Sequence, residues 1–289
     1  MAGIEEHGLI NVGISTFPTD YSIDIAILAR KAEQLGYDSL WLAEHPILPV
    51  NSKTPWPGSA DGKIPKKYAD TADPFVALGR ASAVTENLLL GTGICLVPER
   101  NPLILANEVA TLDMYSKGRF LFGIGAGWLK EETDIMGGDF AHRWTQTREA
   151  VMAMKELWTN VESEFHGKYY DFPPVYSFPM PVQRPHPPIY LGGHAKNVFR
   201  RIVGWGDAWM PNRITPQDIE NGRKTIDSLA SEAGRDPADI GITVYGVAAD
   251  RELLKDFESA GADRAVVSID SVEEIEALSQ LEEIASKLI

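Results

Sequence analysis

Residues 102–124 read Pro102-Leu-Ile-Leu-Ala-Asn-Glu-Val-Ala-Thr-Leu-Asp-Met-Tyr-Ser-Lys-Gly-Arg-Phe-Leu-Phe-Gly-Ile124. The pattern predicts a helix over 102–115 and a short apolar strand over 119–124. The strand lacks a clean alternation of polar and apolar residues, which is typical of a parallel sheet buried on both faces. This stretch is therefore expected to be one helix–strand unit of an α/β fold.

The same unit is repeated toward both ends of the chain. The pattern predicts eight strands, at 11–15, 39–43, 88–94, 119–124, 188–192, 207–210, 242–247 and 264–269. A predicted helix follows each one, at 23–36, 73–85, 102–115, 145–158, 196–203, 216–233, 252–259 and 272–288. Eight such units favour a (β/α)8 TIM barrel over an open doubly wound sheet. We expect residues 1–289 to form a single domain of this kind.

Two long connections interrupt the repeat, one after strand two and one before strand five. The first, 46–72, is rich in proline and is expected on the rim where barrel enzymes place their active sites. A lid or substrate wall and a simple surface excursion both fit it. The second, 160–187, carries six prolines and six aromatic residues, and this aromatic content predicts packing against another part of the protein.

Composition excludes several classes of function. The chain of 289 residues has 27 basic and 41 acidic residues, a net charge of −14, which argues against nucleic acid and anionic membranes as partners. The single cysteine, Cys95, excludes an internal disulfide, and the six histidines lack metal-binding spacing, so no metal is expected. No signal peptide is visible in Met1–Gly8, and the longest apolar stretch, Leu88–Val97, is too short to span a bilayer. We expect a cytoplasmic protein.

The predicted strand ends carry the candidate functional residues. Strand two ends in Glu44-His45, and His45 is either a proton-handling group or a structural histidine of the rim. Strand five ends in Gly192-Gly193-His194 ahead of a helix, where backbone amides either bind phosphate or form only a tight turn. Glycines also end strands three and four, which suggests that a flat or phosphate-bearing ligand approaches the backbone.

Trp128, after the glycines of strand four, either stacks on a planar ligand or plugs the barrel mouth. The glycine spacing there is G-x-G-x-G, which does not match the dinucleotide-binding fingerprint.

These segments together resemble the luciferase-like monooxygenase superfamily, and within it the branch of oxidoreductases that depend on coenzyme F420, a deazaflavin hydride carrier. The resemblance is carried by 101–128, by Leu35-Gly-Tyr-Asp-Ser-Leu-Trp-Leu-Ala-Glu-His45, and by Pro188-Ile-Tyr-Leu-Gly-Gly193 with Gly206-Asp-Ala-Trp209. It covers roughly residues 8–270. It implies a (β/α)8 barrel with the cofactor at the carboxyl-terminal rim.

The resemblance also implies roles for individual residues. Glu44 and His45 would lie close to the redox ring, with His45 catalytic and Glu44 orienting it. A cis peptide bulge at Gly93–Ile94 would back the ring, and Trp128 and Glu131 would contact the cofactor. The phosphate end would bind to a loop formed by Gly192, Gly193 and His194.

The function implied by the resemblance is hydride transfer between coenzyme F420 and a small organic substrate. Some sugar-phosphate-using members carry a glutamate where this chain has Trp128, so their substrate is not carried over. The lysines of the first connection (Lys53, Lys63, Lys66 and Lys67) are candidates to guide the acidic tail of the cofactor. The alternatives are an FMN-dependent monooxygenase supplied by a separate reductase, and a flavin-binding protein without turnover. A homodimer is expected from the resemblance alone.

Overall fold

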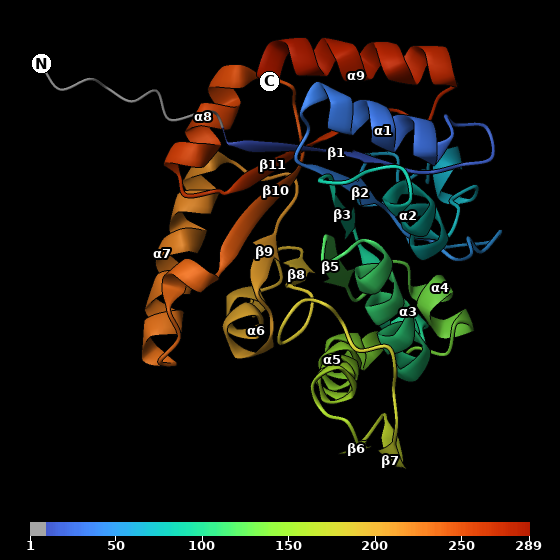
Figure 1. The fold of residues 1–289 in the computed structure, drawn as a ribbon, viewed down its shortest axis with the longest axis vertical. Coiled ribbons are helices and arrows are strands. Elements are labelled where there is room, and N and C mark those ends of the chain that lie inside the picture. Colours follow the sequence, from blue (N-terminus) through green and yellow to red (C-terminus); the bar gives the residue numbers. More distant parts are fainter. Residues whose placement is uncertain (1–9) are drawn as a thin grey trace, which may run out of the picture.

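The computed structural model describes residues 10–289, and its centre is a closed barrel of eight parallel strands (Figure 1). The pairing order is β3-β2-β1-β11-β10-β9-β8-β5, and a pairing of β3 with β5 closes the ring. The strands are β1 (Asn11–Thr16), β2 (Ser39–Leu42), β3 (Leu89–Thr92), β5 (Phe120–Gly125), β8 (Ile189–Gly192), β9 (Ala208–Met210), β10 (Gly241–Val247) and β11 (Arg264–Ser268). This confirms the predicted TIM barrel. Met1–Gly8, where the sequence shows no signal peptide, lies outside the described residues.

Helices surround the barrel and link each strand to the next (Figure 1). They are α1 (Ile25–Leu35), α2 (Pro74–Ser82), α3 (Pro102–Tyr115), α5 (Arg143–Thr159), α6 (Val198–Trp205), α7 (Pro216–Glu232), α8 (Arg251–Ser259) and α9 (Glu274–Leu288). All eight predicted helices are present, with ends shifted by a few residues. No helix within 10–289 combines the length and apolar character that crossing a bilayer requires.

Several short elements escape the sequence prediction. They are α4 (Lys130–Ile135), β4 (Cys95–Leu96), the hairpin of β6 (Ser163–His166) and β7 (Asp171–Val175), and 3₁₀ turns at Lys66–Tyr68, Val97–Glu99, Phe140–His142 and Pro237–Asp239. The hairpin lies in the second long connection. Its Phe165 and Phe172 rings stack with centroids 6.3 Å apart, and Phe172 is buried against the main core. The predicted packing is therefore confirmed for Phe165, Tyr170 and Phe172, whereas Tyr176 and Phe178 are exposed.

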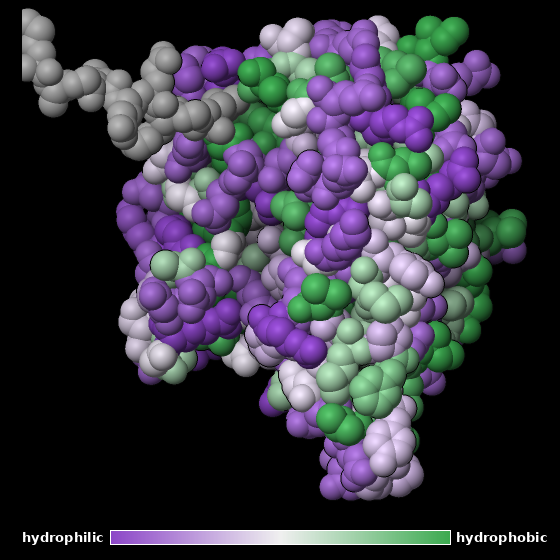
Figure 2. Space-filling model, viewed as in Figure 1, coloured by the Kyte–Doolittle hydropathy of each residue, from purple (hydrophilic) through white to green (hydrophobic). Residues whose placement is uncertain are grey.

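The barrel interior is filled by a small cluster of side chains from several strands. Its buried members are Trp41, Leu121, Met210 and Val266. A much larger apolar layer fills the space between the strands and the surrounding helices. Hydrophilic side chains dominate the face in Figure 2, with apolar ones gathered along its right-hand edge, where Figure 1 shows α2, α3 and α4.

Glycine makes this interior possible at β5. A Cβ atom on Gly123 would lie 1.9 Å from the carbonyl oxygen of Thr92 and 2.9 Å from the side chain of Met210. Backbone atoms cannot give way as a flexible side chain can, so only glycine fits here.

We expect Gly123→Ala to destabilise the protein by about 1–3 kcal/mol, since the added methyl group overpacks the barrel. Gly79→Ala is the matched control, because Gly79 lies in α2 and a methyl group added there would have nothing within 4 Å. The free energy of unfolding of Gly79→Ala should rise by about 0.5–1 kcal/mol, because alanine favours the helix over glycine. Urea unfolding of both variants measures the difference, and equal stabilities would contradict the packing described.

Candidate functional site

His45 lies at the carboxyl end of β2 and is held by a carboxylate from α4. Its Nδ1 is 2.8 Å from Oε2 of Glu132, and both residues are buried. The imidazole ring packs beside Tyr68 and Trp128, with ring centroids 4.8 and 5.9 Å away. An ionised Glu132 requires a proton on Nδ1, which leaves Nε2 as the basic nitrogen. Nε2 has no hydrogen-bond partner within residues 10–289 and is free to exchange a proton.

Glu44 is buried next to His45 but turns to a different partner. Its carboxylate accepts hydrogen bonds from the guanidinium of Arg100 and, at 2.6 Å, from the amide of Leu96. Arg100 also binds Asp73 at 2.7 Å and Glu108 at 3.0 Å. The expectation that Glu44 orients His45 is therefore corrected: Glu132 contacts the ring, and Glu44 anchors the rim.

A third buried acid, Glu99, lies close to this pair. Its Oε1 accepts a hydrogen bond of 2.8 Å from the hydroxyl of Thr133, the residue after Glu132. Burial, and then the negative charge of Glu132, raise the pKa of Glu99 to about 8. No set of three or more His, Cys, Asp or Glu side chains in the described part of the chain could hold a metal ion.

The first long connection, 46–72, is fastened to the barrel mouth by Glu131. This carboxylate accepts hydrogen bonds from the Thr54 hydroxyl at 2.7 Å, the Lys53 amide at 2.7 Å and the Thr54 amide at 3.2 Å. The Thr54 hydroxyl and then the Lys53 amide lower the pKa of Glu131 to about 2. The structure thus shows a loop contact for Glu131, and the cofactor contact that the resemblance implies stays a prediction.

The same loop runs from His45 toward the far side of the mouth. Its Tyr68 lies on His45, and the Trp56 indole donates a 3.1 Å hydrogen bond to the Tyr68 hydroxyl. Arg213, after β9, stacks over Trp56 and donates a 2.7 Å hydrogen bond to the carbonyl of Pro57. These contacts favour the wall interpretation of the loop over the surface excursion.

Most of the strand-end glycines accommodate protein side chains. The Gly93–Ile94 peptide is cis, as predicted. A Cβ on Gly93 would lie 2.6 Å from the Tyr245 hydroxyl, and one on Gly125 would lie 1.9 Å from Cδ1 of Ile94. A Cβ on Gly192 would lie 3.3 Å from Cγ2 of Ile94. At these positions the glycines make room for side chains of the protein itself. The hypothesis that a ligand approaches the backbone therefore applies only to a strand-end glycine that faces open space.

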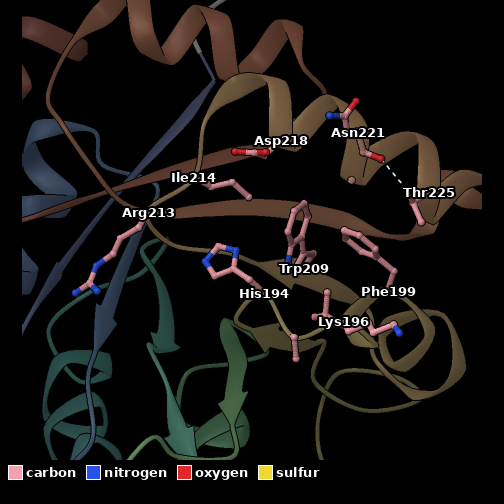
Figure 3. A pocket seen from close by; sticks show the side chains of 12 residues that line it. His194, Lys196, Phe199, Trp209, Arg213, Ile214, Asp218, Asn221 and Thr225 are labelled. Carbon is pink, nitrogen blue, oxygen red and sulfur yellow. Dashed lines mark hydrogen bonds between the residues drawn. The ribbon is translucent and has the colours of Figure 1, made fainter. Parts of the chain in front are cut away.

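That glycine is Gly193, which has a φ of +97° and nothing within 4 Å of an added Cβ. It precedes a cavity of about 420 Å³ between the ends of β8 and β9 and the helices α6 and α7. Figure 3 shows His194, Trp209 and Phe199 facing this space, while Arg213 extends toward the barrel mouth. Lys196 also lines the cavity, as do Ala195, Val198, Ile214, Asp218, Asn221, Gly222 and Thr225.

This cavity is suited to an anion. The N-terminus of α6 has no side-chain hydrogen-bond cap, although its Val198 amide donates to the carbonyl of Ala195, and Lys196 adds a positive charge to the lining. Arg213 also lines the cavity, but its guanidinium contacts Trp56 and Pro57 of the loop. Asp218 is the acidic residue in the lining, and its carboxylate is bound by Thr215. Lys63 and Lys66 of the first connection instead pair with Asp61 and Asp70. The cations at the cavity therefore differ from the lysines proposed from sequence.

Comparison with known proteins gives the family. A family model described as luciferase-like monooxygenase matches residues 18–268. The chain belongs to the luciferase-like monooxygenase family. The uncharacterized protein Mb0978c of Mycobacterium bovis is 37% identical over 232 residues, which cover 78% of this chain and 80% of that protein. The sequence resemblance to this family is thereby confirmed, and the chain is an oxidoreductase of the luciferase-like type.

Solved structures share the barrel at low sequence identity. The monooxygenase RslO1 from Streptomyces bottropensis has a TM-score of 0.78 at 20% identity, covering 96% of this chain and 98% of its own. The coenzyme F420-dependent tetrahydromethanopterin reductase from Methanopyrus kandleri has a TM-score of 0.76 at 18% identity, covering 97% and 99%. A 3,6-diketocamphane monooxygenase from Pseudomonas putida, in complex with FMN, has a TM-score of 0.63 at 20% identity, covering 83% and 68%. Both cofactor types therefore occur on this fold.

Glu131→Ala should free the tip of the 46–72 loop, because three hydrogen bonds to Lys53 and Thr54 are lost. We expect faster cleavage within this loop under limited proteolysis, with little change in global unfolding. Glu220→Ala on α7, which removes an exposed carboxylate paired with Lys224, is the control. If Glu131→Ala is cleaved at the wild-type rate, the hydrogen bonds of Glu131 do not hold the 46–72 loop in place.

Proposed function

We propose that this luciferase-like protein transfers a hydride between coenzyme F420 and a small organic substrate. The observation that carries the proposal is the cavity beyond Gly193, which offers open backbone and the positive charge of Lys196, with Arg213 at its edge, in a protein of net charge −14. Because the whole protein repels anions, a cofactor with several acidic groups needs such a local site. The tail of F420 carries carboxylates beyond its phosphate and fits this requirement better than FMN does.

When bound, the deazaflavin supplies hydride chemistry at its C5 carbon. The protein's own residues bind, orient and handle the proton. Gly193 and the α6 amides would hold the phosphate, and the loop carrying Tyr68 would wall the ring from water. Hydride transfer at a carbon that bears oxygen also moves one proton, and Nε2 of His45 is the group that takes or gives it. A secondary alcohol or the corresponding carbonyl compound is the substrate class that needs this pair of transfers.

FMN-dependent monooxygenation is the second candidate, since structural neighbours include an FMN complex. In that case a separate reductase would supply reduced flavin. A flavin-binding protein without turnover is the third. Titration with each cofactor, followed by product analysis, separates all three.

The homodimer implied by the resemblance belongs to the same proposal. Val76 on α2 and Ile104 and Tyr115 on α3 are large, exposed apolar side chains. A second copy of the chain would cover them. If sedimentation velocity shows only monomer at micromolar concentration, the proposed homodimer is wrong.

The two cofactors are expected to respond differently to loss of the cavity's cations. Lys196→Gln and Arg213→Gln should each weaken F420 binding by about fivefold at low salt, as expected for exposed charge pairs, and weaken FMN less. Lys287→Gln on α9 is the charge-matched control. Fluorescence titration at two salt concentrations measures the affinities, and equal, salt-independent losses for both cofactors would exclude the proposed tail site.

Gly193→Val tests the phosphate end separately. The added side chain is strained at a φ of +97° and would occupy the open space, so both F420 and FMN should bind more weakly. Unchanged affinities for both would remove Gly193 from the cofactor site.

His45→Asn should lower turnover by about 10²–10⁴-fold, as expected for loss of a general acid–base group, while cofactor affinity changes little. The Asn amide can still donate to Glu132 where Nδ1 does, so this variant spares the buried carboxylate that His45→Ala would leave unpaired. F420 reduction is followed by absorbance with a panel of secondary alcohols. If His45→Asn keeps its turnover and only unfolds earlier, His45 is a structural residue of the rim.

A further inference from the structure

Tyr68, in the first long connection, is the centre of an aromatic cluster at the barrel mouth. Four rings surround its own ring, those of Phe17, His45, Trp56 and Trp128, with centroids 4.7, 4.8, 5.7 and 6.4 Å away. They come from three different strand ends and from the loop itself. Because tilted and edge-on aromatic contacts favour particular orientations, the phenol ring of Tyr68 is held in one place.

The hydroxyl group of Tyr68 has one partner, and that partner can only donate. The indole Nε1 of Trp56 donates a 3.1 Å hydrogen bond to it. An indole N–H cannot accept, so the hydroxyl is the acceptor in this bond and keeps its own hydrogen. Within residues 10–289 the Tyr68 hydroxyl has no second hydrogen-bond partner. The phenol hydrogen is therefore available for a further acceptor.

Trp56 is itself fixed by several contacts. Its backbone amide donates to the carbonyl of Gly62 at 2.8 Å, which closes the loop on itself. The guanidinium of Arg213 stacks over the indole at 5.6 Å and donates to the carbonyl of the next residue, Pro57, at 2.7 Å. The indole N–H is therefore held in a set position, and it defines the direction from which the Tyr68 hydroxyl accepts.

The neighbours of Tyr68 place its hydroxyl on the barrel side of the loop. His45 and Trp128 lie at the ends of β2 and β5, and Tyr245 of β10 packs on the side chains that fill the barrel interior. Burial is the main cause of the pKa of about 12 for Tyr245, and the charge of an ionised Tyr68 would add to it. An effect of this kind requires the two hydroxyl groups to be near each other.

The cluster offers a substrate much apolar surface and few polar atoms. Phe17, Trp56, Tyr68 and Trp128 are each partly exposed, so their rings can contact a ligand. Burial raises the pKa of Tyr68, so its hydroxyl stays neutral and able to donate at physiological pH. A hydrocarbon skeleton with a single oxygen matches such a lining, since the carbon atoms pack on the rings and the oxygen meets the hydroxyl.

We propose that the Tyr68 hydroxyl donates a hydrogen bond to the oxygen of an apolar secondary alcohol or ketone, and that the Trp56 indole orients this hydroxyl. The proposal deepens the proposed function and rests on it, because it names the substrate contact of the same reaction. Tyr68 is then a catalytic residue, since it touches the substrate, and Trp56 is a positioning residue.

The bond from Tyr68 assists the reaction without moving a proton. When an alcohol is oxidised, its O–H proton passes to Nε2 of His45, and its C–H bond breaks with both electrons leaving as hydride to the deazaflavin. The oxygen keeps its bond to carbon and becomes the carbonyl oxygen. Negative charge builds on that oxygen during the transfer, and a donor already in position stabilises it. The same donor remains on the carbonyl oxygen of the product.

The test compares Tyr68→Phe with Trp56→Phe. Tyr68→Phe removes the hydroxyl and keeps the ring, whereas Trp56→Phe keeps an aromatic side chain and removes the N–H that orients the hydroxyl. Tyr176→Phe is the matched control, because it removes an exposed phenol hydroxyl that is bonded to Glu162 on the β6–β7 hairpin.

The first readout needs no cofactor. Proton–nitrogen NMR of the indole groups, with Trp56 assigned by its loss in Trp56→Phe, reports the hydrogen bond to Tyr68. In Tyr68→Phe the Trp56 indole proton should move upfield, because its acceptor is lost, and in Tyr176→Phe it should not move. An unchanged Trp56 signal in Tyr68→Phe would show that the indole does not orient the hydroxyl.

The same signal reports the substrate contact. Cyclohexanone added to the apo protein at millimolar concentration should shift the Trp56 indole proton in wild type and not in Tyr68→Phe. Methylenecyclohexane, which has the same shape with a CH₂ group in place of the oxygen, should give no such shift. If cyclohexanone leaves the wild-type signal unchanged, or shifts it equally in Tyr68→Phe, the Tyr68 hydroxyl meets only solvent and the proposal is wrong.

Activity with F420 and cyclohexanol completes the test. Tyr68→Phe should lower kcat by about 10²-fold, as expected for loss of a donor to developing charge, with a smaller change in KM. Trp56→Phe should lower kcat by about fivefold, the effect of one ordinary hydrogen bond, and Tyr176→Phe should match wild type.

The two proposals fail in different ways. If F420 gives no turnover but cyclohexanone shifts the Trp56 signal through Tyr68, the proposed function is wrong and the hydrogen-bond donor stands. If F420 turns over and kcat is the same in Tyr68→Phe, the donor role alone is wrong. Should Tyr68→Phe not fold, the loss of kcat in Trp56→Phe still decides, and full activity in that variant would contradict the proposal.

Discussion

The negative charge of Glu44 is buried at the end of β2 and is balanced by Arg100, and the rim of the barrel is assembled around this ion pair. Arg100 also reaches Asp73 at the start of α2 and Glu108 on α3, so one guanidinium joins two consecutive strand–helix units of the barrel. A buried ion pair gains little net stability over apolar packing, but loss of one partner leaves a costly buried charge. The arrangement therefore fixes position more than it adds stability. The residue whose position it fixes most directly is His45.

Glu99 and Glu132 lie close to the Glu44–Arg100 ion pair and are also buried, but neither has a lysine or arginine partner in the described residues. Glu44 has the Arg100 cation and the Leu96 amide, whereas Glu99 and Glu132 have only Thr133 and His45. Glu44 therefore has a counter-charge, whereas burial, and then the charge of Glu132, raise the pKa of Glu99, which has none. The contrast explains why neighbouring glutamates on one rim serve different purposes. It also shows why charge counting along the sequence does not assign those purposes.

The barrel was predictable because its signal is local: each strand and helix carries its own apolar pattern. Helix α4 escaped because its polar run, Lys-Glu-Glu-Thr-Asp-Ile, has no apolar face long enough to detect. At the site, His45, Trp128 and Gly193 were predictable from their place at strand ends. The role of Glu132 was not, because it depends on which of two adjacent glutamates turns inward, and that is settled by packing between residues 87 positions apart. Two consecutive acids just after a strand end were the available signal.

Helix α4 carries both fastenings of the site on adjacent residues. Glu131 binds the loop that walls the mouth, and Glu132 binds the imidazole ring. A segment of six residues cannot move one side chain far without displacing the next. A movement of the loop is therefore expected to move the Glu132 carboxylate that orients His45. Opening of the site and the orientation of His45 are coupled through α4.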